Sequence, residues 1–78
     1  MKFTWQEQKD YETIEAEIAS LEEKILMLEN ETTKYSRDFA KLNEIMKEKE
    51  ECESKLEEKM DRWMYLEELA ARIEADNS

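Results

Sequence analysis

The sequence predicts an all-α fold, an antiparallel two-helix coiled-coil hairpin that forms a single domain over residues 1–78. Three observations support this prediction. The chain contains no Gly and no Pro, the residues that most often interrupt helices. Charged residues make up 44% of it, mostly Glu and Lys, which favour helix. Apolar residues recur at alternating steps of three and four in two stretches, which is typical of coiled coils.

The first helix is expected from about residue 5 to about residue 31. Thr4 and Glu7 have the spacing of a capping box, in which each side chain accepts a hydrogen bond from the backbone N–H of the other residue. The apolar stripe of this helix occupies heptad positions a and d and consists of Tyr11, Ile14, Ile18, Leu21, Ile25 and Leu28. The alternative, a disordered acidic segment with a net charge of -10, is disfavoured by the regularity of this stripe.

The apolar repeat breaks where Thr32 and Tyr35 occupy the next a and d positions. Side chains in this stretch compete for backbone hydrogen bonds, so we place the turn at about 31–36. Ser36 is the expected N-cap of the second helix, predicted at about 37–75. A short connection between two long helices makes them antiparallel neighbours. Intermolecular pairing, side by side or as a parallel dimer, is the alternative.

The second helix carries its own stripe of a and d positions. Its members are Leu42, Ile45, Lys49, Cys52, Leu56, Lys59, Trp63, Leu66, Ala70 and Ile73. Pairing Leu28 with Leu42 sets the expected register. That register brings Phe3, Trp5 and Trp63 to the open end of the hairpin, where we expect an aromatic cluster.

No residue pattern supports catalysis or a cofactor in this chain. Without His, the commonest general base is missing, and without Gly no phosphate-binding loop can form. Cys52 is the only cysteine, so it forms no internal disulfide and has no partner ligand for a metal. No apolar run is long enough to span a membrane. We therefore expect a cytoplasmic, non-enzymatic protein that binds no metal.

Basic residues cluster at the expected turn. Lys34, Arg37 and Lys41 lie between residues 33 and 42, where Asp38 is the only acidic residue. Ordinary surface charge is the commoner explanation of such a cluster. The functional alternative is a contact with phosphate groups at the end of an arm.

The chain resembles the C-terminal domain of ABC-F ATPases, most closely the Uup type, over residues 2–9, 11–18, 21–25, 35–42 and 59–69. Residues 2–9 read K-F-T-W-Q-E-Q-K, where the family commonly has K-L-S-Y-K-E-Q-R. Residues 35–42 correspond to the family's turn into its second helix. Residues 59–69, K-M-D-R-W-M-Y-L-E-E-L, are similar to its E-R-W-x-x-L-E-E segment. The first and last of these segments are the most specific, and the resemblance covers nearly the whole chain.

The resemblance implies a non-catalytic arm of a larger protein with two ATP-binding cassettes and no membrane-spanning part. Many ABC-F proteins act on the ribosome in translation, and the Uup-type domain is associated with DNA binding. The implied partners are DNA or ribosomal RNA and the parent cassettes, which would hold the ATP. The candidate contacts are Lys34, Arg37 and Lys41, followed by Lys55, Lys59 and Arg62.

The alternative function is a structural or protein-interaction module. In this interpretation the hairpin docks on its own cassettes or on a partner protein through the additional apolar and aromatic side chains of the second helix. The candidate residues are Met46, Met60, Met64 and Tyr65.

Overall fold

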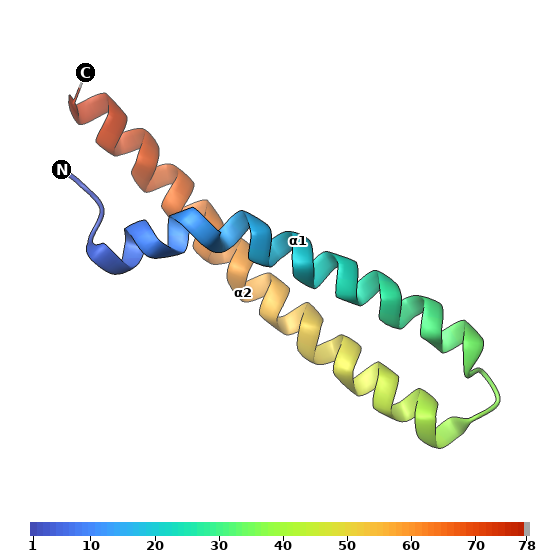
Figure 1. The fold of residues 1–78 in the computed structure, drawn as a ribbon. Coiled ribbons are helices and arrows are strands. Elements are labelled where there is room, and N and C mark those ends of the chain that lie inside the picture. The colour runs from blue at the N-terminus through green and yellow to red at the C-terminus, as the bar shows by residue number, and fades with distance from the viewer. Residues whose placement is uncertain (78) are drawn as a thin grey trace.

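The computed structural model describes residues 1–77, and these form two helices and no strand. Helix α1 spans Trp5–Lys34 and helix α2 spans Phe39–Asn77. They run in opposite directions, cross at a shallow angle and are joined by a short turn (Figure 1). The result is a rod of 59 × 15 × 15 Å. The predicted all-α hairpin is therefore confirmed. Ser78, the end of the predicted domain, lies outside the described residues, and the assignment to one domain stays a prediction.

The predicted capping box begins α1. The backbone N–H of Glu7 donates to Thr4 Oγ1 at 3.2 Å, and the N–H of Thr4 donates to Glu7 Oε1 at 2.8 Å. The helix ends at Lys34 rather than at about residue 31. The hydroxyl of Thr32 donates to the carbonyl of Glu29 at 2.6 Å, so this side chain bonds within the helix and does not end it.

The turn comprises residues 35–38, later than the predicted 31–36. Asp38, not Ser36, caps α2, because its Oδ1 accepts the backbone N–H of Lys41 at 3.1 Å. The N–H of Asp38 donates to the carbonyl of Tyr35 at 3.0 Å and closes the turn. No residue in the described range has a positive φ, which explains how the chain reverses without Gly.

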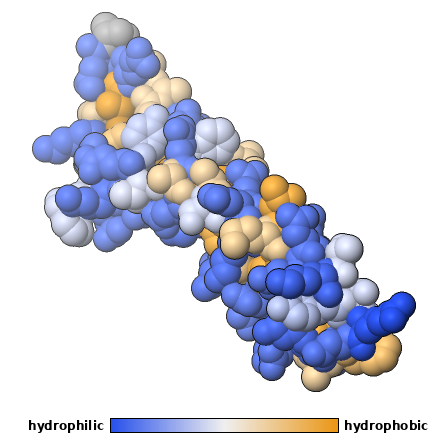
Figure 2. Space-filling model, turned by 45° about the vertical axis from the view of Figure 1, so that its right-hand side comes forward, coloured by the Kyte–Doolittle hydropathy of each residue, from blue (hydrophilic) through white to orange (hydrophobic). Residues whose placement is uncertain are grey.

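The core follows the two predicted stripes. Its buried side chains are Ile14, Leu28, Ile45, Cys52 and Leu66. Leu28, Ile45 and Cys52 form one cluster near the turn, on which Leu21, Ile25 and Tyr35 pack. Charged residues cover the outside, so most of the face in Figure 2 is hydrophilic.

The register differs from the predicted pairing of Leu28 with Leu42. Leu42 lies beside Thr32, one helical turn further along α1, where both line a shallow groove. At the open end, the Tyr11 hydroxyl donates to Glu67 Oε1 at 3.2 Å. The later turn accounts for this shift, because it extends α1 before the chain reverses.

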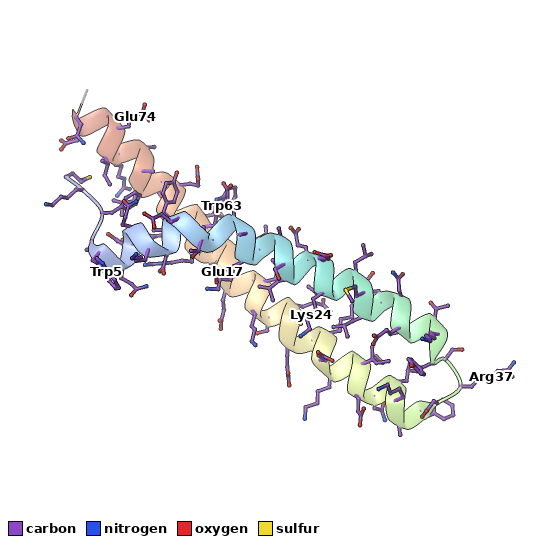
Figure 3. All side chains as sticks on the ribbon, in the orientation of Figure 1. Trp5, Glu17, Lys24, Arg37, Trp63 and Glu74 are labelled. Carbon is purple, nitrogen blue, oxygen red and sulfur yellow. The ribbon has the colours of Figure 1, made fainter. Side chains whose placement is uncertain are left out.

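The predicted aromatic cluster of Phe3, Trp5 and Trp63 does not form. Trp5 is 72% exposed, with the ammonium of Lys9 5.7 Å from its ring centroid. Phe3 packs instead on Tyr11, with ring centroids 5.1 Å apart. Trp5 is the first residue of α1 and points away from α2, as Figure 3 shows. The prediction failed because the first turns of α1 contact α2 through polar side chains, those of Glu7 and Asp10.

Candidate nucleic-acid interface at the turn

The three predicted contact residues lie at one end of the rod. Lys34 is the last residue of α1, Arg37 belongs to the turn, and Lys41 lies in the first turn of α2. The side chain of Arg37 projects outward from the turn (Figure 3). Both ends of the described chain lie at the opposite end of the rod (Figure 1). The hairpin thus holds this basic turn far from its terminal end.

Tyr35 positions two of the three cations. The ammonium groups of Lys34 and Lys41 each lie 5.5 Å from the centroid of its ring. Tyr35 itself is half-buried and packs on the core cluster. Attraction between an ammonium group and the face of an aromatic ring holds each lysine near the turn and leaves its hydrogen-bond donors available.

None of these three cations forms an ion pair with any residue between 1 and 77. The one carboxylate in the turn, that of Asp38, is occupied as the cap of α2. Four lysines elsewhere also form no ion pair within the described residues 1–77, but they are spread along the rod: Lys2, Lys9, Lys47 and Lys55. The turn is distinctive because its three cations are grouped beside a single acidic residue.

Of the further candidate contacts, Lys55, Lys59 and Arg62, the last two are paired with carboxylates across the helix interface. Lys59 Nζ lies 2.6 Å from Glu17 Oε2, and Arg62 Nη2 lies 3.1 Å from Asp10 Oδ2. Lys55 lines a groove beside Lys59 and forms no ion pair with the part of the chain that the structure describes. The pairing satisfies Lys59 and Arg62 within the hairpin, so they contribute less positive potential than the turn does.

These pairs are maintained by carboxylates that ionise readily. Lys59, followed by the hydroxyl of Thr13, lowers the pKa of Glu17 below its ordinary value. The Gln6 amide, followed by Arg62, lowers the pKa of Asp10. Both carboxylates are therefore charged at neutral pH, and both pairs are intact there.

The sequence interpretation included neither of the two aromatic residues near the turn, Tyr35 and Phe39, in the candidate interface. Tyr35 was recognised only as a heptad position, although its ring contacts the ammonium groups of Lys34 and Lys41. Phe39, the first residue of α2, is 76% exposed and follows Arg37 closely in the chain. In the sequence, Phe39 stands off the a and d stripe and between the basic residues Arg37 and Lys41, a pattern that indicates an exposed aromatic residue near the basic cluster.

The candidate protein-interaction residues are also on the surface. Met46, Met60, Met64 and Tyr65 are all exposed. Tyr65 is not free, however, because its hydroxyl donates to Glu7 Oε2 at 2.6 Å and Arg62 lies 5.1 Å from its ring.

Other classes of site receive no support from the described chain. Residues 1–77 contain no group of three or more His, Cys, Asp or Glu side chains arranged to hold a metal ion. Neither α1 nor α2 is apolar enough over a sufficient length to cross a membrane.

A family model described as the ABC transporter C-terminal domain matches residues 2–68, which include the turn and most of both helices. The chain belongs to this family. A curated relative of this C-terminal domain is the uncharacterized ABC transporter ATP-binding protein YfmR of Bacillus subtilis (strain 168). The two are 35% identical over 74 residues, which cover 95% of the present chain and 12% of the relative. The C-terminal domain thus spans only a small part of that relative's length. No solved structure matches the present chain.

Proposed function

We propose that this domain is the non-catalytic C-terminal arm of an ABC-F ATP-binding protein and that its turn contacts nucleic acid, either DNA or ribosomal RNA. The observation that carries the proposal is the group of three cations at the turn, Lys34, Arg37 and Lys41, none of which forms an ion pair with a carboxylate among residues 1–77. Nucleic-acid backbones are recognised through such cations, whose attraction to phosphates supplies much of the binding free energy.

The rest of the hairpin suits the role of an arm. Its net charge of -10 repels phosphate backbones along most of its surface, so contact is favoured only where the local charge is positive. The capped turn and the cations held by Tyr35 are ordered before any ligand binds, which reduces the entropy lost on binding.

The parent protein in this proposal carries the ATP-binding cassettes, and it works in the cytoplasm. The cassettes would join the hairpin at its terminal end, opposite the turn. Binding and hydrolysis of ATP would belong to the cassettes, because the present chain has no Gly and hence no phosphate-binding loop. The arm would position the parent ATPase on its nucleic-acid partner.

The test is a titration of the chain with a labelled DNA duplex and with a labelled ribosomal RNA hairpin, followed by fluorescence anisotropy over a range of salt concentrations. We expect saturable binding to at least one of them. If the three cations contact three phosphates, the logarithm of the binding constant should fall with the logarithm of salt concentration with a slope of about -2 to -3.

The decisive variant reverses the three charges in Lys34→Glu, Arg37→Glu and Lys41→Glu. Its matched control reverses three unpaired lysines away from the turn, in Lys2→Glu, Lys9→Glu and Lys47→Glu, and changes the net charge equally. Binding should be lost in the turn variant and largely retained in the control. Equal losses in both variants, or no saturable binding by the unmodified chain, would reject the proposed contact.

The second candidate function is docking on the parent cassettes or a partner protein, supported by the exposure of Met46 and Met64. A pulldown with isolated cassettes at high salt tests it, with Met64→Ser as the variant. The second variant is Tyr65→Phe, which keeps the ring that contacts Arg62. Capture that persists at high salt and fails with Met64→Ser would favour docking, and capture that is indifferent to Met64→Ser would reject this surface.

A further inference from the structure

Phe39 is the most exposed large apolar side chain among the described residues, at 76%. It begins α2, whereas the apolar stripe of that helix starts at Leu42 and Ile45, which face the core. Phe39 therefore contributes little to the packing of the hairpin. An aromatic ring in this position is free to contact a ligand.

The two aromatic residues near the turn, Tyr35 and Phe39, differ in their exposure and in their contacts. The ring of Tyr35 is half-buried and occupied by the ammonium groups of Lys34 and Lys41. Within residues 1–77, the ring of Phe39 contacts neither another ring nor a cation. Figure 2 shows hydrophobic surface directly beside hydrophilic surface at the turn end of the rod. An exposed ring thus stands between Arg37 and Lys41 in the sequence, and neither of these cations forms an ion pair with a carboxylate among residues 1–77.

This combination fits one class of ligand, a flexible anionic chain that carries flat rings. Exposed aromatic side chains stack on nucleic-acid bases, while Arg and Lys contact the adjacent phosphates. In a continuous duplex the bases are already paired and stacked, so only an unpaired base offers its face to Phe39. A purely apolar ligand would leave the three cations without a counter-charge.

We propose that the turn binds an unpaired nucleotide in a loop or single strand, with its base stacked on Phe39 and its flanking phosphates bound by Arg37 and the two lysines. This inference rests on the proposed nucleic-acid contact and specifies its substrate class. It assigns Phe39 the choice between unpaired and paired nucleic acid, and it assigns the cations the general affinity.

The test compares two labelled RNAs of the same length and composition, a stem-loop with an unpaired loop and a fully paired duplex. The variants are Phe39→Leu, which keeps an apolar side chain without a ring, and Trp5→Leu as the matched control. Trp5 is an aromatic residue of similar exposure at the opposite end of the rod. We expect Phe39→Leu to weaken binding of the stem-loop about 5- to 100-fold and to leave binding of the duplex unchanged. Trp5→Leu should alter neither.

A second measurement assigns the effect to the base. Removing the bases from the loop nucleotides, while keeping their sugars and phosphates, should weaken binding to the unmodified chain but not to Phe39→Leu. Circular dichroism should show equal helix content and melting temperature for both proteins, because Phe39 is exposed.

The outcomes separate this inference from the proposed function. If the charge reversal at the turn abolishes binding but Phe39→Leu binds the stem-loop normally, the contact stands and the stacking is overturned. Equal weakening of stem-loop and duplex by Phe39→Leu also overturns it. If Phe39→Leu instead abolishes self-association of the chain, measured by sedimentation, the ring is an interface between copies. Absence of binding to either RNA by the unmodified chain removes both proposals.

Discussion

Tyr65 on α2 donates its hydroxyl hydrogen to Glu7 Oε2 at 2.6 Å, while Glu7 Oε1 accepts the backbone N–H of Thr4 at 2.8 Å. One carboxylate thus joins the start of α1 to the neighbouring helix. The N–H of Thr4, followed by the hydroxyl of Tyr65, lowers the pKa of Glu7. The capping box is therefore part of the contact between the helices as well as a feature of α1.

Replacing Thr4 with Ala should destabilise the hairpin by about 1 kcal/mol, because it removes the hydroxyl that accepts the N–H of Glu7. The measurement is urea unfolding followed by circular dichroism. Thr33→Ala is the control, since Thr33 is exposed near the other end of α1. Equal stability of the two variants would contradict a stabilising cap.

The pair of Glu17 and Lys59 should make part of the stability depend on pH. The folded pKa of Glu17 lies below its ordinary value of 4.5, so the pair stabilises the hairpin above that pH. The contribution is lost as the pH falls through the folded pKa. Both side chains are 41% exposed, so solvent screens the pair and its worth at pH 7 should be only about 0.2–1 kcal/mol.

This contribution is measured as the difference in unfolding free energy between the unmodified chain and Glu17→Gln at several pH values. It should be constant from pH 6 to 8 and shrink as the pH is lowered below 4.5. Glu23→Gln, at an exposed position, is the control for the general effect of removing one negative charge. A difference that grows on acidification would contradict the assigned direction.

Leu66→Ala should be the most damaging of simple truncations. Leu66 is fully buried, and removing its side chain both forfeits apolar burial and leaves a cavity, at a cost of about 2–5 kcal/mol. This is a large fraction of the stability of any small domain. Thermal unfolding checks it against Met64→Ala, whose side chain is 65% exposed and whose loss should change stability by less than about 0.5 kcal/mol. Similar melting temperatures would show that the core lies elsewhere.

The thiol of Cys52 should react slowly in the folded chain, because it is buried in the cluster with Leu28 and Ile45. Its rate with an aromatic disulfide reagent should rise sharply with urea. The comparison is a chain with Cys52→Ala and Ser54→Cys, which moves the thiol to an exposed position of the same helix. That chain should react fast without urea, and equal rates in native buffer would contradict the packing.

The heptad pattern determined which residues are buried, because the a and d positions of a helix all lie on one side. Every buried residue belongs to a predicted stripe. The capping box also followed from sequence, since its two side chains act on backbone groups only three residues apart. These are local relationships, and they hold in any packing that leaves the helices intact.

The position of the turn and the exposure of the aromatic residues were decided by the tertiary structure. The hydroxyl of Thr32 donates to a carbonyl of its own helix, and Tyr35 packs on the core cluster. Helix α1 therefore continues past the predicted turn, and the pairing of residues between the two helices shifts. Trp5 was expected in an aromatic cluster at the open end, but the packing of the two helices leaves it exposed, and Phe39 is exposed as well. The sequence alone determined that three cations lie near the turn. That two of them, Lys34 and Lys41, lie over the ring of Tyr35 was decided only by the chain reversal, which brings the end of α1 next to the start of α2.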